Sequence, residues 1–112
     1  MKRIDCIIRP SKLEDVKEEL NKIGVNGLTV VQVLGCGMQK GHTQYYRGHE
    51  YRINLLPKIL VSLIVKDALV DTAVESIIKG SRTGEIGDGK IFIYNVEEVI
   101  RIRTGEKGEE AI

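Results

Sequence analysis

The feature that most constrains the fold is a long polar stretch between two apolar, β-branched runs. Residues 35–56 carry both histidines and most of the tyrosines, and they separate the runs at 28–34 and 59–65. Two strands of a hairpin need only about two to five connecting residues, and this connection is roughly four times as long. Such a length predicts a long loop with a function of its own. A tolerated disordered insertion is the alternative.

The first strand and helix follow from residue spacing. Residues 2–9 alternate, with Ile4, Cys6 and Ile8 on one side. Proline cannot donate to a sheet ladder, so Pro10 ends this strand. Ser11 with Glu14 three residues later is a capping-box pattern that starts a helix. The apolar stripe of that helix and the glycines that close it are Leu13, Val16, Leu20 and Ile23, then Gly24 and Gly27.

The second half repeats the arrangement. Residues 58–66 form a strand that is apolar on both faces except for Ser62. Asp67 can cap a second helix, and Gly80 ends it. The apolar stripe of this helix is Leu69, Val70, Ala73, Val74, Ile77 and Ile78.

The last third predicts a fourth strand and a tail. A polar, glycine-rich turn, residues 81–90, leads into a strand at 90–94. Residues 99–103 form one more short extended piece. The charged tail at 104–112 is expected to be mobile.

This order predicts an α+β fold. Strand, helix, strand, strand, helix, strand with right-handed crossovers gives the split β-α-β, ferredoxin-like sandwich, in one domain spanning residues 1–112. Two helices can cover only one face of a four-stranded sheet. Because the strands at 28–34 and 58–66 are apolar on both faces, the second face needs a partner. We therefore expect a homo-oligomer in which open sheet faces pack together.

Composition excludes several classes of protein. The chain is 42% hydrophobic and 29% charged, with a formal net charge of +1, which argues against nucleic-acid binding by bulk electrostatics. No signal peptide or apolar run long enough to span a bilayer is present, so we expect no membrane insertion and a cytoplasmic location. Cys6 and Cys36 suit buried free thiols, with a disulfide or a metal pair as alternatives.

The glycine-rich turn is the second concentrated signal. Closely spaced glycines allow backbone N–H groups to converge on an anion, and Lys90 adds positive charge. Arg101 and Arg103 alternate with isoleucines, so both would leave a strand on the same side. One lysine and two arginines near such a turn suit a polyphosphate. The sequence is not a Walker A motif, and a β-turn beside a solvated basic edge is the alternative.

Other candidate residues lie in the long loop. His42 and His49 lack the companions of a metal site, so loop polarity explains them better. Exposed phenols at Tyr45, Tyr46 and Tyr51 suit modification or partner contact, and local packing is the alternative. No catalytic arrangement stands out, so we expect a protein that is not an enzyme.

Several runs of residues together carry a family resemblance. They are Ile4-Asp5, Ile7-Ile8-Arg9-Pro10, Gly27-Leu28-Thr29-Val30, Gln39-Lys40-Gly41-His42-Thr43, Tyr46-Arg47-Gly48, Glu50-Tyr51, Leu56-Pro57-Lys58, Thr83-Gly84, Ile86-Gly87-Asp88-Gly89-Lys90-Ile91-Phe92 and Val99-Ile100-Arg101-Ile102-Arg103-Thr104-Gly105. On these, the chain resembles the nitrogen-regulatory P-II signal-transduction proteins from end to end. The resemblance implies a homotrimer with three nucleotide sites in clefts between subunits.

The resemblance also implies ligands and their residues. ATP or ADP would compete for each cleft, and 2-oxoglutarate would bind once Mg-ATP is in place. Gln39 would help to hold the metal, the backbone amides of Gln39, Lys40 and Gly41 would cradle the dicarboxylate, and Lys58 would pair with it. The nucleotide residues would be Ile7, Thr29 and Ile64 around the adenine and ribose, and Gly35, Gly37, Gln39, Gly87, Asp88, Gly89, Lys90, Arg101 and Arg103 at the phosphates.

By the same resemblance, residues 35–56 are the T-loop, which reports the ligand state to targets of nitrogen assimilation and its transcription. An ammonium transporter, glutamine synthetase or a modifying enzyme would be such targets. Tyr51 matches the tyrosine that is uridylylated in some bacteria. Uridylylation of Tyr51 is therefore a hypothesis.

The chain departs from the family pattern at three places. Met38 stands where many members carry an arginine, Ser62 where a glutamate is common near the base, and His49 where the residue is usually small. These departures leave an alternative, an adenylate sensor that has lost the 2-oxoglutarate response or the Tyr51 modification. Two rivals of similar topology fit worse. An RNA-recognition domain needs aromatic residues on its central strands, and an acyl-phosphate hydrolase needs an anion-binding loop after the first strand.

Overall fold

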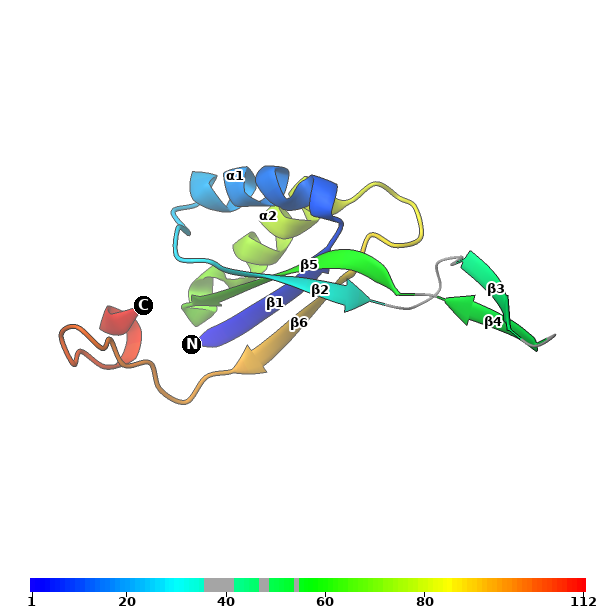
Figure 1. Cartoon of the computed structure of the whole chain (residues 1–112). Coiled ribbons are helices and arrows are strands. Elements are labelled where there is room, and N and C mark those ends of the chain that lie inside the picture. The colour runs from blue at the N-terminus through cyan, green and yellow to red at the C-terminus, as the bar shows by residue number, and fades with distance from the viewer. Residues whose placement is uncertain (36–41, 47–48, 54) are drawn as a thin grey trace.

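The computed structural model describes residues 1–35, 42–46, 49–53 and 55–112. Two helices cover one face of a four-stranded sheet, and a two-stranded hairpin lies beyond one end of that sheet (Figure 1). The elements are β1 (Lys2–Ile8), η1 (Pro10–Lys12), α1 (Leu13–Lys22), β2 (Thr29–Gly35), β3 (His42–Tyr46), β4 (His49–Ile53), β5 (Leu56–Val65), η2 (Asp67–Leu69), α2 (Val70–Ser81), β6 (Lys90–Asn95) and η3 (Gly108–Ala111).

The sheet has the order β2-β5-β1-β6, and every neighbouring pair is antiparallel. Each helix therefore connects two parallel strands that have one antiparallel strand between them. This arrangement is the split β-α-β topology, so the predicted ferredoxin-like fold is confirmed.

The core lies between the sheet and the helices. Alternate residues of β1 and β5 face the helices, and the apolar stripes of α1 and α2 pack on them. The predicted inward positions of β1 are correct, because Ile4, Cys6 and Ile8 are all buried. Burial raises the pKa of the free Cys6 thiol to about 11, which keeps it protonated. Cys36 lies outside the described residues.

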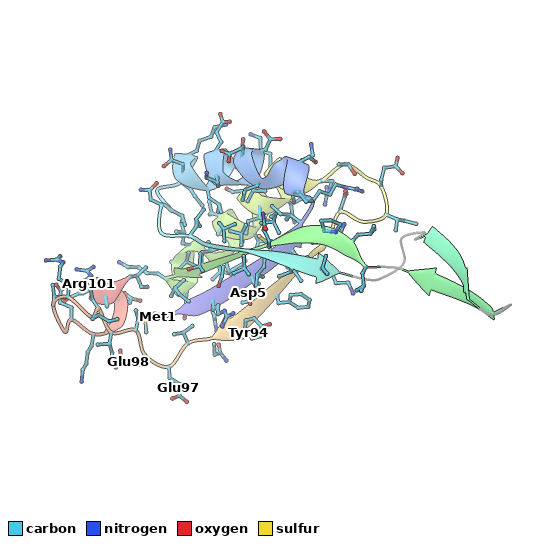
Figure 2. All side chains as sticks on the ribbon, in the orientation of Figure 1. Met1, Asp5, Tyr94, Glu97, Glu98 and Arg101 are labelled. Atoms are coloured by element: carbon cyan, nitrogen blue, oxygen red, sulfur yellow. The ribbon has the colours of Figure 1, made fainter. Side chains whose placement is uncertain are left out.

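The other face of the sheet is open in the single chain. Val31, Phe92 and Tyr94 are each more than 40% exposed. The buried side chain of Asp5 forms an ion pair with Arg3 at 2.9 Å, and Arg3 lies over the Tyr94 ring. Figure 2 shows Asp5 and Tyr94 on the side of the sheet away from the helices. As expected from the sequence, no described element of the chain covers this face.

The predicted helix caps are wrong. Ser11 lies inside the 3-10 turn η1, α1 begins at Leu13, and no side chain caps either element. Asp67 likewise lies inside η2, and its carboxylate pairs with the Met1 ammonium at 2.9 Å. In both places a 3-10 turn that begins just after a strand takes up the residue expected to cap the helix.

The prediction that Gly80 ends the second helix is also wrong. α2 continues through Gly80 to Ser81, whose hydroxyl donates to the Ile77 carbonyl at 2.6 Å. A Cβ atom at position 80 would lie 2.9 Å from the backbone of Val16 in α1. Gly80 is therefore a point at which the backbones of the two helices approach each other closely. Gly24, by contrast, ends α1 as expected, with a φ of 86°.

Three segments differ from what the sequence indicated. Residues 35–56 are not one unstructured loop, because β3 and β4 pair in antiparallel register. Residues 99–103 do not form an extended strand. A single bridge joins Ile100 to Lys107, and Gly105 donates its N–H to the Arg101 carbonyl, so the chain turns back here. The tail, expected to be mobile, forms η3 and hydrogen bonds with the preceding segment.

Candidate functional site

The glycine-rich turn joins α2 to β6 at one end of the sheet. Gly84, Gly87 and Gly89 all have positive φ values, of 90°, 103° and 102°. Gly89 also lies very close to β1, since a Cβ atom there would lie 1.6 Å from the Ile7 carbonyl oxygen. Any other residue at position 89 would both strain the backbone and collide with β1.

The carboxylate of Asp88 organises this turn. It accepts a hydrogen bond from the Thr83 hydroxyl and others from the backbone N–H groups of Thr83, at 2.8 Å, and Gly84, at 2.9 Å. Arg9 approaches it at 3.3 Å. These bonds, that of the Thr83 hydroxyl first, hold the pKa of Asp88 well below its usual range. The hydrogen bonds that the Asp88 carboxylate accepts therefore hold the shape of the turn.

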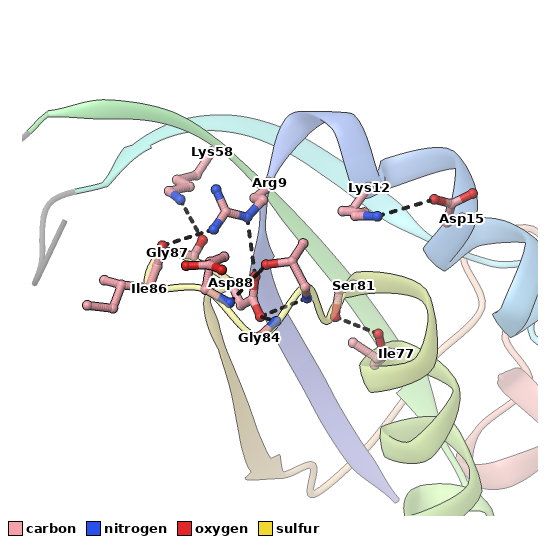
Figure 3. Close-up of polar contacts among 12 residues, drawn as sticks. Arg9, Lys12, Asp15, Lys58, Ile77, Ser81, Gly84, Ile86, Gly87 and Asp88 are labelled. Atoms are coloured by element: carbon pink, nitrogen blue, oxygen red, sulfur yellow. Dashed lines mark hydrogen bonds and ion pairs between the residues drawn. The ribbon is translucent and has the colours of Figure 1, made fainter. Parts of the chain in front are cut away.

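Two cations hold consecutive carbonyl groups of the turn (Figure 3). Arg9 Nη2 donates to the Ile86 carbonyl at 2.9 Å, and Lys58 Nζ donates to the Gly87 carbonyl at 2.8 Å. Lys58 is buried, and burial first and the nearby positive charge of Arg9 second lower its pKa. The ion pair with Asp88 offsets the charge of Arg9, and the charge of Lys58 remains beside the glycine-rich turn, where it can attract an anion.

Gly35 and Ile7 also lie at this end. A Cβ atom on Gly35 would lie 3.1 Å from Lys58 Cγ, so the glycine leaves room for the lysine side chain to pass. Ile7 pairs with Lys90 in the register of β1 and β6. The structure therefore brings together seven of the predicted site residues here: Ile7, Gly35, Lys58, Gly87, Asp88, Gly89 and Lys90.

The opposite end of the sheet holds an open cavity of about 560 Å³. Thr29 and Ile64 line it together with Ser62, and the C-terminal residues Ala111 and Ile112 form part of its wall. Arg101 lies at this end of the molecule, beyond β6 (Figure 2). Its guanidinium contacts the Glu106 carboxylate at 3.3 Å and the Glu110 carbonyl at 3.0 Å.

The prediction that Arg101 and Arg103 lie near the glycine turn is wrong within one chain. β6 leads from the turn to the other end, and its six residues span about 20 Å at the usual rise per residue. Arg103 is exposed in the turn that follows. Thr29, Ile64, Arg101 and Arg103 are therefore separated from the seven residues at the turn.

Four predicted residues, Gly37, Gln39, Lys40 and Gly41, lie outside the described residues, and Tyr51 belongs to β4. Two residues with direct roles in the turn were missed, Arg9 and Thr83. Arg9 precedes Pro10 at the end of the first strand, and its partners are almost 80 residues away, so no local pattern connects them. Thr83 was visible only as part of the glycine-rich run.

The described residues contain neither a metal site nor a membrane-spanning helix. Within residues 1–35 and 55–112 and the described part of the hairpin, no cluster of histidine, cysteine and carboxylate side chains could hold a metal ion. No helix in the described part of the chain is long and apolar enough to cross a membrane.

Comparison with known proteins identifies the family. The family described as nitrogen regulatory protein P-II matches residues 1–106. The nitrogen regulatory protein P-II of Rhodospirillum rubrum is 55% identical over 112 residues, and the nitrogen regulatory protein P-II 1 of Escherichia coli K12 is 54% identical, each over the whole of both chains. The solved structure of Arabidopsis thaliana PII bound to citrate is 40% identical, with a TM-score of 0.82 over 99% of this chain and 91% of that one. The chain belongs to the P-II family of nitrogen regulatory proteins.

Proposed function

We propose that the chain is a homotrimeric sensor that binds ATP or ADP in clefts between its subunits and, together with Mg-ATP, 2-oxoglutarate. The observation that carries the proposal is the separation of the predicted nucleotide residues between the two ends of the sheet. One end offers a glycine turn and cations, the other a largely apolar cavity and Arg101. A nucleotide would need both the cations of the turn and the apolar cavity. A second copy therefore has to bring its far end, the end that carries the cavity and Arg101, against the turn of the first.

The open sheet face supports such an assembly. Val31, Phe92 and Tyr94 expose apolar surface, while the ion pair of Arg3 and Asp5 satisfies the buried charge beneath them. A head-to-tail contact between copies, one end against the other, closes into a ring when its rotation permits. A trimer would then have three equal clefts.

In each cleft the turn would bind phosphate groups. Its closely spaced N–H groups and Lys90 come from one subunit, and Arg101 and Arg103 of the neighbouring subunit would complete the charge. Thr29 and Ile64 of the neighbour would contact the base and ribose, with Ile7 on the turn side. Gly37 and Gln39 would contribute from the T-loop, and Gln39 would hold the magnesium ion.

Lys58 would pair with 2-oxoglutarate. It is a buried cation at the base of the T-loop, and burial first and the charge of Arg9 second lower its pKa, so a bound anion beside it would stabilise its charged form. Backbone groups of Gln39, Lys40 and Gly41 would complete the cradle. The relative from Arabidopsis, bound to citrate, supports a carboxylate ligand for proteins of this fold.

The T-loop, residues 35–56, would carry the output. Its hairpin, β3 and β4, lies beyond the body of the sheet, where it can reach another protein (Figure 1). The targets would be an ammonium transporter, glutamine synthetase or an enzyme that modifies Tyr51, in the cytoplasm. A near-complete switch of this loop requires the ligand to bind one of the loop's two states more tightly than the other by about 5.5 kcal/mol.

The protein would act by binding and would not be an enzyme, in keeping with the names of its relatives.

Calorimetric titration tests the proposal. We expect ATP to bind the purified protein, and 2-oxoglutarate to bind only when Mg-ATP is present. Binding of ATP without any response to 2-oxoglutarate would favour the alternative, an adenylate sensor with a changed second input. Binding of neither ligand would contradict the proposed function.

A further inference from the structure

Arg9 is the one residue from outside the glycine turn that contacts both the carboxylate and the backbone of the turn among the described residues. Its Nε donates to Asp88 Oδ1 at 3.3 Å, and its Nη2 donates to the Ile86 carbonyl at 2.9 Å. The Arg9 side chain is only 25% exposed. A planar guanidinium makes the two contacts from two different nitrogen atoms held in a rigid fork, whereas an ammonium group has all its donors on one atom.

Lys58 provides a second hold on the same turn, at the next carbonyl, that of Gly87. The proposed function gives Lys58 another task, which is to pair with 2-oxoglutarate. A carboxylate accepts a stronger hydrogen bond from an ammonium group than a neutral carbonyl does. Binding of the dicarboxylate would therefore weaken the contact between Lys58 and Gly87.

The turn needs such holds because its backbone is permissive. Gly84, Gly87 and Gly89 adopt positive φ, and glycine has more conformations to lose than any other residue. A turn released at Gly87 would keep its shape only if another contact remained close by. The contacts of Arg9 at Ile86 and Asp88 flank that position on both sides.

We propose that Arg9 is a positioning residue that holds the glycine turn in its phosphate-binding shape while Lys58 engages 2-oxoglutarate. The inference rests on the proposed function and deepens it. Arg9 thereby allows the two ligands to occupy neighbouring sites without weakening each other. By linkage, whatever Arg9 contributes to the effect of 2-oxoglutarate on ATP it contributes equally to the effect of ATP on 2-oxoglutarate.

Three variants separate this role from simple charge. Arg9→Lys keeps the charge and loses the two-point contact, while Arg9→Gln loses both. Lys12→Gln is the matched control, because Lys12 lies three residues further along, at the end of η1, and approaches Asp15 of α1 at 4.0 Å. It removes the same charge as Arg9→Gln and leaves the described contacts of the turn intact.

Calorimetry on the full-length chain measures the ATP dissociation constant with and without saturating 2-oxoglutarate. For Arg9→Lys we expect ATP affinity to fall about threefold alone and about tenfold or more with 2-oxoglutarate present, an extra loss set by the missing contact. Arg9→Gln should lose at least as much, and Lys12→Gln should match the wild type. Equal losses with and without 2-oxoglutarate would overturn the proposal, since a merely structural defect lowers both affinities alike.

A second measurement uses only the wild type and does not depend on whether a variant folds. Hydrogen exchange at the amides of residues 84–89 should be no faster after 2-oxoglutarate is added to the Mg-ATP complex than before. Faster exchange there would show that the turn is released, and would overturn the role of Arg9 while leaving the proposed function in place. Failure of the wild type to bind ATP would instead overturn the proposed function and this inference together.

Discussion

The two ends of the sheet differ in how their polar groups are used. At the turn end, Arg9 and Lys58 hold backbone carbonyls, and Asp88 is surrounded by donors. At the far end, an open cavity has a mainly apolar lining, and Arg101 is held by the chain's own tail. The first arrangement suits an anion and the second suits a flat, largely apolar group. Under the proposed function a nucleotide would contact both ends, which is why the proposed site requires two subunits.

The largest expected effect comes from Gly89→Ala. The new Cβ atom would lie 1.6 Å from the Ile7 carbonyl oxygen, at a φ of 102°. We expect a loss of roughly 3 kcal/mol or more in the free energy of unfolding, measured by urea denaturation at fixed protein concentration, and no detectable ATP binding.

Gly84→Ala is its matched control. Gly84 has a similar positive φ of 90°, yet no described atom lies within 4 Å of its would-be Cβ. Only the backbone strain remains, so we expect a loss of about 1–2 kcal/mol. Equal losses in the two variants would show that the contact with β1 does not matter.

The next largest effect should be a loss of affinity for 2-oxoglutarate, with little change in the affinity for ATP. Lys58→Met removes the buried cation, so 2-oxoglutarate should bind about a hundredfold more weakly in calorimetry with Mg-ATP present. The affinity for ATP should change much less, because Arg9 still holds the turn. A comparable loss of ATP affinity would place Lys58 in the nucleotide site instead.

Gly80→Ala should destabilise the fold and spare both ends. Its Cβ atom would press on the backbone of Val16, 2.9 Å away, where neither helix can easily move. We expect a loss of about 2 kcal/mol in thermal or urea unfolding, as is usual for overpacking. ATP affinity should be that of the wild type well below the unfolding transition. A weakened affinity would show that the helix layer, and not only the two ends, sets the site.

The smallest effect concerns pH. Burial, and then the charge of Arg9, lower the pKa of Lys58 from its ordinary value of 10.5. The folded protein therefore releases this proton at a lower pH than the unfolded chain does. Between the two pKa values the contribution of Lys58 to stability rises with pH, while the cation needed for 2-oxoglutarate disappears. Calorimetry with Mg-ATP present should show 2-oxoglutarate binding weakening before pH 10.5 is reached. ATP binding should weaken less, because Arg101 and Arg103 stay charged at the proposed phosphate site.

Local patterns predicted much of this molecule. Strand alternation placed Ile4, Cys6 and Ile8 in the core, and the helical stripes placed Val16, Leu20, Ala73 and Ile77 there. The order of elements was enough to fix the sheet topology. The glycine turn and Lys90 were also visible, because clustered glycines and a cation are local signals.

Other features depend on contacts between distant residues, and local spacing could not reveal them. Glycine at position 80 is typical of a helix end, but here it allows α2 to lie close to the backbone of Val16 in α1. Ile100 to Arg103 alternate like a strand, yet the bond from the Gly105 N–H to the Arg101 carbonyl turns the chain back. The functions of Arg9 and Thr83 depend on Asp88, which only the folded chain brings to Arg9.

The most direct test of a site shared between subunits is nucleotide binding by mixed oligomers. One chain carries Lys90→Ala at the turn end, and the other carries Arg101→Ala and Arg103→Ala at the far end. Oligomers of either chain alone should bind ATP poorly. After co-expression in equal amounts, about a quarter of the clefts should combine an intact turn with an intact far end and recover normal affinity. Mixed oligomers that bind ATP no better than their parents would contradict the account, because each site would then lie within one chain.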